Sequence, residues 1–441
     1  SAGVVALVSQ IYVTRQNHAM TSFLRSKALT SHAKHCASAW TAGMQFMCRA
    51  ASSKVSTTDQ IGGRIANIRT TPLLIDLKRP YHQAYGVSHA ATTILVEVET
   101  EGGVIGYGEC VGTPTVAGIR AFIDESVRGW HGRSVFESRR LIGEAYQRVF
   151  RESGTHSAAR FSAQILGGLE MALWDAAGRA TGLPVHQLLG GRVQDTLQFF
   201  AFVQGETPEE LALDASLYAR DGFEVFYVKL GRGDALDVEI VKQIRQAIGP
   251  LRRLRVDANE AWDPLRFSRM IRAIENAGGP IEFVEQPCKC ESIPALAQIK
   301  SRSPVAISAD QSVFTPEEAL EVVKQQAGDL VLLGLHEVGG ITRFLKAAAI
   351  AEAGGLNVCL HGLFESGITT YAAIQAASLV PNIDDGNQYM NHLLRFDVVS
   401  GDGLKLDRGR LNVPTKPGLG FDIDQSAVQR AAAAYNDRLS Q

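Results

Sequence analysis

Four short stretches in the second half of the chain each end on one charged residue. They read FYVK (226–229), RVD (255–257), EFVE (282–285) and AISAD (306–310). Their closing residues are 28, 28 and 25 positions apart, which is about the length of a strand, a helix and two loops. The pattern therefore predicts successive parallel strands that bring Lys229, Asp257, Glu285 and Asp310 to one end of a sheet.

This repeat indicates a (β/α)₈ barrel, in which catalytic groups lie at the C-terminal ends of the strands. Three carboxylates that converge there would repel one another unless a divalent cation neutralised them. A site made of oxygen ligands favours Mg²⁺, with Mn²⁺ as the alternative. We therefore expect Asp257, Glu285 and Asp310 to bind a metal ion beside Lys229.

The rest of the chain divides into two patterns. Residues 329–334 and 356–361 are short apolar runs that predict the sixth and seventh barrel strands. Before the barrel, residues 93–100 and 104–109 predict an antiparallel hairpin, and residues 116–179 carry helical patterns. The chain therefore begins its fold with an α+β module that lacks βαβ alternation.

Composition limits the partners and the compartment. The 441 residues are 45% hydrophobic and 20% charged, with a net charge of −2, which gives no reason to expect nucleic acid or a membrane surface as partner. No apolar run reaches the roughly 18–20 residues of a membrane helix. The six cysteines show neither paired CxxC spacing nor a dense framework, which favours a reducing compartment. We expect the cytoplasm, or an organelle matrix.

The N-terminal segment differs from everything after it. Its first 58 residues contain no Asp or Glu but carry six Lys and Arg among many Ser, Thr and Ala. Such a composition is typical of an organelle transit peptide. The alternative is a wrongly extended start, with Met20, Met44 or Met47 near the true beginning. In either case residues 1–60 are expected not to belong to the fold.

Several motifs in order carry a family resemblance. They are GYGE (106–109), MALWDAAG (171–178), LP (183–184), LLGG (188–191) and PGLG (417–420). With these motifs and the spaced acids, the chain from about residue 61 to 424 resembles the muconate-lactonizing and mandelate-racemase branches of the enolase superfamily. The resemblance implies an α+β capping domain (61–190) over a modified (β/α)₈ TIM barrel (191–399). Residues 400–441 are expected to return to the capping domain.

The resemblance also implies a site. Asp257, Glu285 and Asp310 match the Mg²⁺ ligands of the family, whose members bind a substrate carboxylate to the metal and remove the proton α to it. The resulting enolate is stabilised by the metal. Lys229 matches the second lysine of the family's Lys-x-Lys motif, the usual base. A nearby metal and partial burial are expected to lower the pKa of Lys229 toward working pH.

Three positions depart from the family pattern. Tyr227 replaces the first lysine of the motif and shares the inward face with Lys229. Its phenol could donate a hydrogen bond, act as acid or base, or only pack in the barrel. Gly334 stands where relatives carry a lysine or an aspartate on the sixth strand. Gln311 stands where many relatives have a glutamate.

His361 ends the seventh strand, where racemase-type relatives place a catalytic histidine. Without an aspartate at position 334, its tautomer and basicity must be set by another group. Glu365 could orient His361 or bind substrate. Further substrate contacts are expected from Asn259 and Asn391 and, in the capping-domain loop, from Tyr81, His82 and Tyr85.

The expected function is a lyase: a dehydratase of a hydroxy acid or acid sugar, in which Lys229 removes the α-proton and His361 protonates the departing hydroxide. The alternative is a racemase, epimerase or cycloisomerase that uses the same chemistry on a carboxylate. A third reading is an inactive enolase-fold binding protein, against which the complete set of metal ligands and Lys229 argues. The partner is a small-molecule carboxylate that the sequence does not name, and we expect a homo-oligomer.

Overall fold

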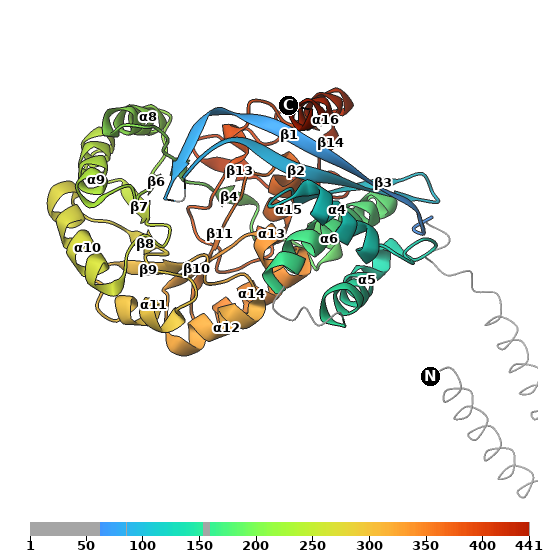
Figure 1. Ribbon diagram of the computed structural model, residues 1–441, viewed down its shortest axis with the longest axis horizontal. Helices are drawn as coiled ribbons and strands as arrows, with labels where there is room; N and C mark the ends of the chain where they lie inside the picture. The colour runs from blue at the N-terminus through green and yellow to red at the C-terminus, as the bar shows by residue number, and fades with distance from the viewer. Residues whose placement is uncertain (1–61, 85, 153–158, 441) are drawn as a thin grey trace, which may run out of the picture. The chain divides into compact units, whose positions relative to one another are not determined.

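The computed structural model describes residues 62–84, 86–152 and 159–440 (Figure 1). The predicted N-terminal segment, residues 1–60, and Tyr85 of the capping loop lie outside these ranges. None of the helices in the described ranges is long and apolar enough to cross a membrane.

The capping region begins with a three-stranded antiparallel sheet of β1 (Ile65–Gln83), β2 (Gly86–Thr100) and β3 (Ile105–Val111). The pairing of β2 with β3 runs from Thr93 opposite Val111 to Glu99 opposite Ile105, which confirms the predicted hairpin. The long first strand β1, which pairs with β2 along most of its length, was not predicted.

Helices follow this sheet in the chain. They are α4 (Val116–Ser126), α5 (Ser138–Ala145), α6 (Ala159–Thr181) and the short α7 (Val185–Leu188). Of these, α6 packs on β3 and β2. Glycines let β3 lie directly on α6: a Cβ at Gly106 would be 2.3 Å from the Ala172 carbonyl oxygen, and one at Gly108 would be 2.1 Å from the Gly168 carbonyl oxygen. This close approach gives a physical reason for the two glycines in the GYGE motif.

The barrel contains a seven-stranded parallel sheet in sequence order. Its strands are β5 (Ala201–Phe202), β6 (Val225–Lys229), β7 (Arg253–Asp257), β8 (Phe283–Glu285), β9 (Ala306–Ala309), β10 (Leu330–Leu333) and β11 (Asn357–Leu360). The structure thereby confirms the four strands that were predicted from their charged ends, and also the predicted sixth and seventh strands. Because all seven strands run the same way, their C-terminal residues share one end of the sheet.

Helices surround these strands as an outer layer (Figure 1). They are α8 (Pro208–Arg220), α9 (Asp234–Ile248), α10 (Pro264–Gly278), α11 (Ile293–Lys300), α12 (Pro316–Gln325), α14 (Ile341–Ala353) and α15 (Gly367–Ala377), with the single-turn α13 (Leu335–Val338) directly after β10. Four of them start alike, with an N-cap side chain that accepts a backbone N–H and a proline in the first turn; the N-cap residues are Thr207, Asp263, Ser292 and Thr315.

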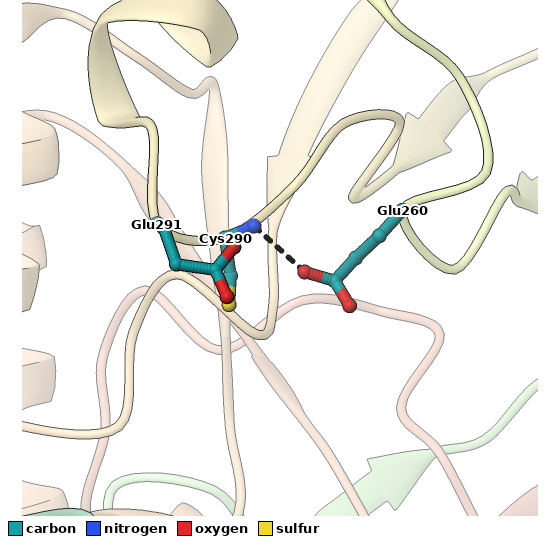
Figure 2. Close-up of side chains that lie close together, drawn as sticks. All are labelled: Glu260, Cys290 and Glu291. Carbon is teal, nitrogen blue, oxygen red and sulfur yellow. Dashed lines mark hydrogen bonds between the residues drawn. The ribbon is translucent and has the colours of Figure 1, made fainter. Parts of the chain in front are cut away.

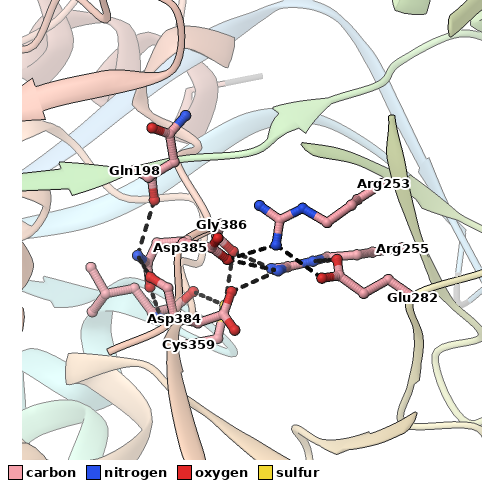
Figure 3. Close-up of polar contacts among 10 residues, drawn as sticks. Gln198, Arg253, Arg255, Glu282, Cys359, Asp384, Asp385 and Gly386 are labelled. Atoms are coloured by element: carbon pink, nitrogen blue, oxygen red, sulfur yellow. Dashed lines mark hydrogen bonds and ion pairs between the residues drawn. The ribbon is translucent and has the colours of Figure 1, made fainter. Parts of the chain in front are cut away.

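An irregular segment takes the place of an eighth strand. Residues 383–387 make two isolated parallel bridges, Val358 with Ile383 and Phe199 with Asn387. Beneath them, the buried Arg255 guanidinium of β7 donates to Glu282, to Asp384 and to the Gly386 carbonyl (Figure 3). The arginine therefore ties β7 to the segment that completes the barrel.

The C-terminal residues pack on the capping helix α6. Leu419 donates its backbone N–H to Asp175, and Arg179 donates to the Phe421 carbonyl. The last helix, α16 (Gln425–Leu439), contacts β1. The segment after the barrel thus contacts both the helix and the sheet of the capping region.

Candidate active site

Three buried carboxylates gather at the C-terminal end of the barrel sheet. Asp257 and Glu285 end β7 and β8, and Asp310 directly follows β9. The Tyr227 hydroxyl lies 2.7 Å from Asp257 Oδ2 and 2.9 Å from Glu285 Oε1. Ligand atoms of Glu285, Asp310 and His361 all lie within 4.8 Å of one another. The structure therefore brings the expected metal ligands together.

The donor set fits a divalent cation. Within the described ranges, Glu285 Oε2 and both carboxylate oxygens of Asp310 are buried and have no hydrogen-bond partner. Burial and repulsion from neighbouring carboxylates raise the pKa of Glu285 well above its usual range. Burial raises the pKa of Asp310 to about 7, with contributions from Glu337 and Asp257. Keeping these buried carboxylates ionised costs free energy, and a hard cation bound to their oxygens offsets that cost. Asp257, Glu285 and Asp310 would therefore hold Mg²⁺.

Asn259 holds Asp257 in place. Its backbone N–H donates to Asp257 Oδ1 at 2.7 Å and its side-chain amide donates to Oδ2 at 2.8 Å. Asn259 adopts a φ of 42°, in the left-handed region that asparagine tolerates better than most residues. The sequence predicts that Asn259 contacts substrate; its N–H groups bind a candidate metal ligand, and its Oδ1 has no hydrogen-bond partner among the described residues.

Lys229 forms a buried ion pair with Asp257. Burial alone would lower the pKa of Lys229, but Asp257, Tyr81 and the other carboxylates raise it well above its usual value. The predicted lowering of this pKa supposes a bound metal ion; without one, the ammonium neutralises a carboxylate, which favours its charged form. A divalent cation at Asp257 would offset that negative charge and weaken the effect.

Tyr227 is a neutral phenol in this site. Its ring stacks on Phe200, with centroids 4.4 Å apart and an interplanar angle of 8°, and the residue is fully buried. Burial, then Asp257 and Glu285, raise the pKa of Tyr227 well above 10. The hydroxyl can therefore donate a hydrogen bond but is a poor base.

His361 has a partner that the sequence pattern did not reveal. Its Nδ1 lies 2.8 Å from Glu337 Oε2 and 3.5 Å from Asp310 Oδ1. Burial alone would lower the pKa of His361, but Asp310 and Glu337 raise it to about 9. Glu337 lies on α13, so a search of strand ends could not find it. The signal available in the sequence was an acid, Glu337, one helical turn beyond Gly334.

Gly334 explains why the partner comes from α13. A Cβ added at Gly334 would lie 2.5 Å from Glu337 Oε2 and 3.4 Å from the His361 carbonyl oxygen. Any side chain at position 334 would therefore compete with the Glu337 carboxylate for the same space. In this chain the strand end carries no side chain, and the following helical turn supplies the acid.

Glu365 lies beside His361 but does not make its Nδ1 hydrogen bond, which goes to Glu337. Burial, then the nearby Glu109, raise the pKa of Glu365 well above its usual range. Glu109, on β3, accepts hydrogen bonds from the Ser366 backbone N–H and the Thr369 hydroxyl. The capping sheet is thereby fixed to the loop and helix that follow His361.

The other residues that were expected to contact substrate lie in different surroundings. Tyr81 is buried against Phe364, with ring centroids 4.9 Å apart, and its hydroxyl interacts with Lys229. His82 lines a small pocket together with Tyr81 and Lys229. Asn391 instead donates to Asp397 at 2.6 Å, and no contact in the described ranges ties it to the carboxylates. Tyr85 lies outside the described residues.

A second cluster of possible ligands lies after β7 and β8 and is formed by Glu260, Cys290 and Glu291 (Figure 2). Glu260 accepts the backbone N–H of Cys290 at 2.7 Å. The Arg160 guanidinium lies 3.8 Å from Cys290 Sγ and supplies positive charge to the cluster. Burial raises the pKa of Cys290 to about 11, which keeps the thiol protonated and a weak ligand.

The fold combines a capping sheet and helices with a parallel barrel whose strand ends carry acids. This combination is typical of one class of barrel enzyme, and comparison with known proteins supports that assignment. Residues 66–190 match the N-terminal domain of mandelate racemase and muconate lactonizing enzyme, and residues 210–427 match the enolase C-terminal domain-like family. The chain belongs to the mandelate racemase and muconate lactonizing branch of the enolase superfamily.

Individual relatives are isomerases. An L-Ala-D/L-Glu epimerase of Bacillus subtilis is 32% identical over 359 residues, covering 81% of this chain and 96% of the relative. Muconate cycloisomerase 1 of Rhodococcus opacus is 32% identical over 378 residues, covering 83% and 97%. The crystal structure of a dipeptide epimerase from Enterococcus faecalis, complexed with Mg and the dipeptide L-Leu-L-Tyr, has a TM-score of 0.74 at 29% identity, covering 81% and 99%. The chain is therefore an enzyme of this superfamily.

Proposed function

We propose that this enzyme is an isomerase that removes and returns the proton α to a substrate carboxylate, as a racemase or epimerase does. The observation that carries the proposal is the placement of two basic groups. Lys229 contacts Asp257, at one end of the row of three carboxylates. His361 contacts Asp310, at the other end. A substrate held at the carboxylates would therefore meet a base from each side.

The two bases have different supports. The ammonium of Lys229 pairs with Asp257, so it can give up a proton only when the charge of that carboxylate is offset. Glu337 accepts the Nδ1 proton of His361, which leaves Nε2 as the nitrogen that exchanges a proton with substrate. When bound, a divalent cation would supply positive charge that attracts the substrate carboxylate and acidifies the α C–H bond.

Isomerisation is favoured over dehydration by the relatives. The two curated relatives described above are an epimerase and a cycloisomerase, and the related crystal structure is that of a dipeptide epimerase. The expectation of a dehydratase receives no support from them. A proton transfer between the two faces of one carbon also needs a group on each side, which the separated Lys229 and His361 provide. The substrate class we propose is a small carboxylate with an acidified α-carbon, and dipeptides are the first compounds to test.

The experiment is α-proton exchange in D₂O with Mg²⁺, followed by NMR and polarimetry on both stereoisomers of each test carboxylate. The wild type is expected to exchange and interconvert both isomers. Lys229→Ala is expected to lose exchange from one isomer, and His361→Asn from the other, while each keeps exchange of the opposite isomer. Both variants should lose at least about 100-fold in interconversion, the lower end of what a general base contributes.

Two outcomes would contradict the proposal. Release of water or of another leaving group, with no return of the α-proton, would identify a lyase. Wild-type interconversion by His361→Asn would show that His361 has no part in proton transfer. Glu352→Gln, an exposed change near the end of α14, is the matched control for handling and folding.

A further inference from the structure

Tyr227 joins two of the candidate metal ligands. Its hydroxyl lies between Asp257 Oδ2 at 2.7 Å and Glu285 Oε1 at 2.9 Å, and all three residues are fully buried. The second oxygen of Glu285, Oε2, has no hydrogen-bond partner among the described residues. One oxygen of Glu285 is therefore engaged by the phenol, and the other is available to a cation.

The ring of Tyr227 is fixed by its packing. It is stacked on Phe200 at 4.4 Å and contacts Phe202 at 5.1 Å between centroids. Both aromatic neighbours precede β6 in the chain and lie in the barrel core. The hydroxyl is thus held at the carboxylates, and reaching a substrate carbon would require it to leave both of them.

We propose that Tyr227 is a positioning residue for the metal site, which holds the facing oxygens of Asp257 and Glu285 so that the remaining oxygens can bind a divalent cation. This inference goes beyond the proposed function, because it concerns the affinity for the cation and holds for whichever reaction follows. Groups that hydrogen-bond to metal ligands orient them and tune the site.

A phenol suits this position electrostatically. Its single proton can be donated to one carboxylate at a time, and the group stays uncharged. A lysine at position 227 would add a second ammonium near Lys229, and its charge would oppose a divalent cation. Tyr227 therefore keeps two acids close together without competing with the cation for their negative charge.

The test is the affinity of the EDTA-stripped protein for Mg²⁺ alone, measured by calorimetric titration with MgCl₂. Tyr227→Phe keeps the ring stack and removes only the hydroxyl. We expect it to bind Mg²⁺ about 10–100-fold more weakly, the usual effect of removing a hydrogen-bond partner of a metal ligand. The loss of α-proton exchange should be larger at limiting than at saturating Mg²⁺, because the change acts through the affinity for the cation.

Tyr389→Phe is the control, since it removes another buried hydroxyl, one that donates to the Leu404 carbonyl instead of to a carboxylate. Its Mg²⁺ affinity should match the wild type. Near-UV circular dichroism checks folding, and Tyr227→Met is the second variant if Tyr227→Phe does not fold. An unchanged affinity in whichever variant folds overturns the proposal.

Exchange that is lost at saturating Mg²⁺, with affinity unchanged, would overturn the proposal in another way and make Tyr227 an acid or base. Failure of the wild type to exchange any tested carboxylate would count against the proposed function only. The Mg²⁺ titration would still decide the role of Tyr227.

Discussion

In the proposed reaction, the Glu337 carboxylate supports His361 as a base. It lies 2.8 Å from His361 Nδ1, and both side chains are buried. A carboxylate at Nδ1 fixes one tautomer and stabilises the imidazolium that forms when Nε2 takes a proton. The acid that contacts the histidine here therefore lies on α13 and not at the strand end, where the family resemblance predicted it.

Glu337→Gln should test this role at nearly constant volume. Because an amide can present its N–H₂ to Nδ1, the tautomer that leaves Nε2 free to accept a proton loses its preference. We expect kcat for interconversion to fall by about 100-fold or more. Exchange should be lost only from the isomer that His361 deprotonates, as followed by NMR in D₂O.

Glu337→Asp keeps the charge on a shorter side chain and should recover part of the lost rate. Wild-type kcat in Glu337→Gln would show that Glu337 does not orient the histidine. Equal loss of exchange from both isomers would point to a general disruption of the site.

At the level of elements, a charged connection braces the irregular segment that takes the place of an eighth strand. Arg255 of β7 reaches Glu282 before β8 and Asp384 in the segment after α15 (Figure 3). Its guanidinium is almost fully buried, whereas the neighbouring Arg253 remains 37% exposed while paired with Glu282 and Asp385. The two arginines share a strand and a partner but differ in burial.

This difference predicts unequal effects on stability. Arg255→Ala removes one partner of a buried ionic group and should lower the free energy of unfolding by about 3 kcal/mol. Arg253→Ala, at a half-exposed pair, should cost less than about 1 kcal/mol. Urea unfolding of both variants in EDTA measures the difference, and equal losses would show that Arg255 does not brace the barrel.

Four barrel strands could be predicted from the sequence because each carries its own apolar run and a charged end at regular spacing, and two more because each is a short apolar run. Gly106 and Gly108 were found as part of a motif, but their contact with α6 needed the structure. Glu337 was missed because its function depends on how α13 turns after β10. The link from Arg255 to Asp384 joins residues 129 positions apart. Neither local pattern nor spacing encodes such a contact.

At the scale of the whole molecule, the carboxylate site couples stability to pH and to metal. Asp310 has a folded-state pKa of about 7, raised by burial above its unfolded value. Its folded form holds a proton that the unfolded chain releases, so stability falls as pH rises from about 4 to 7. His361, raised to about 9 by Asp310 and Glu337, contributes stability below about 6.5 that is lost as pH rises through 9.

In the metal-free protein, Asp310 and His361 both make the free energy of unfolding decrease as the pH rises. In EDTA, the melting temperature should therefore decrease between about pH 5 and 9 from the effect of this site. Cation binding needs ionised carboxylates, so the rise in melting temperature caused by Mg²⁺ should grow over the lower part of that range. Differential scanning calorimetry measures both curves.

Asp310→Asn should flatten the pH dependence in EDTA and remove most of the response to Mg²⁺. A rise in melting temperature that is the same at pH 6 and pH 8 would count against a site built on these carboxylates.

The overlap between a side chain at position 334 and the Glu337 carboxylate also constrains the order in which this site could change. A single substitution that places an aspartate at Gly334 would introduce its new carboxylate into space that Glu337 already fills. Removing the Glu337 carboxylate first, as in Glu337→Ala, would open that space but leave His361 without this partner until the second substitution occurs. Each one-step path between the two arrangements therefore crosses an impaired intermediate. A laboratory evolution experiment that seeks to move the acid to the strand end should mutate both codons together.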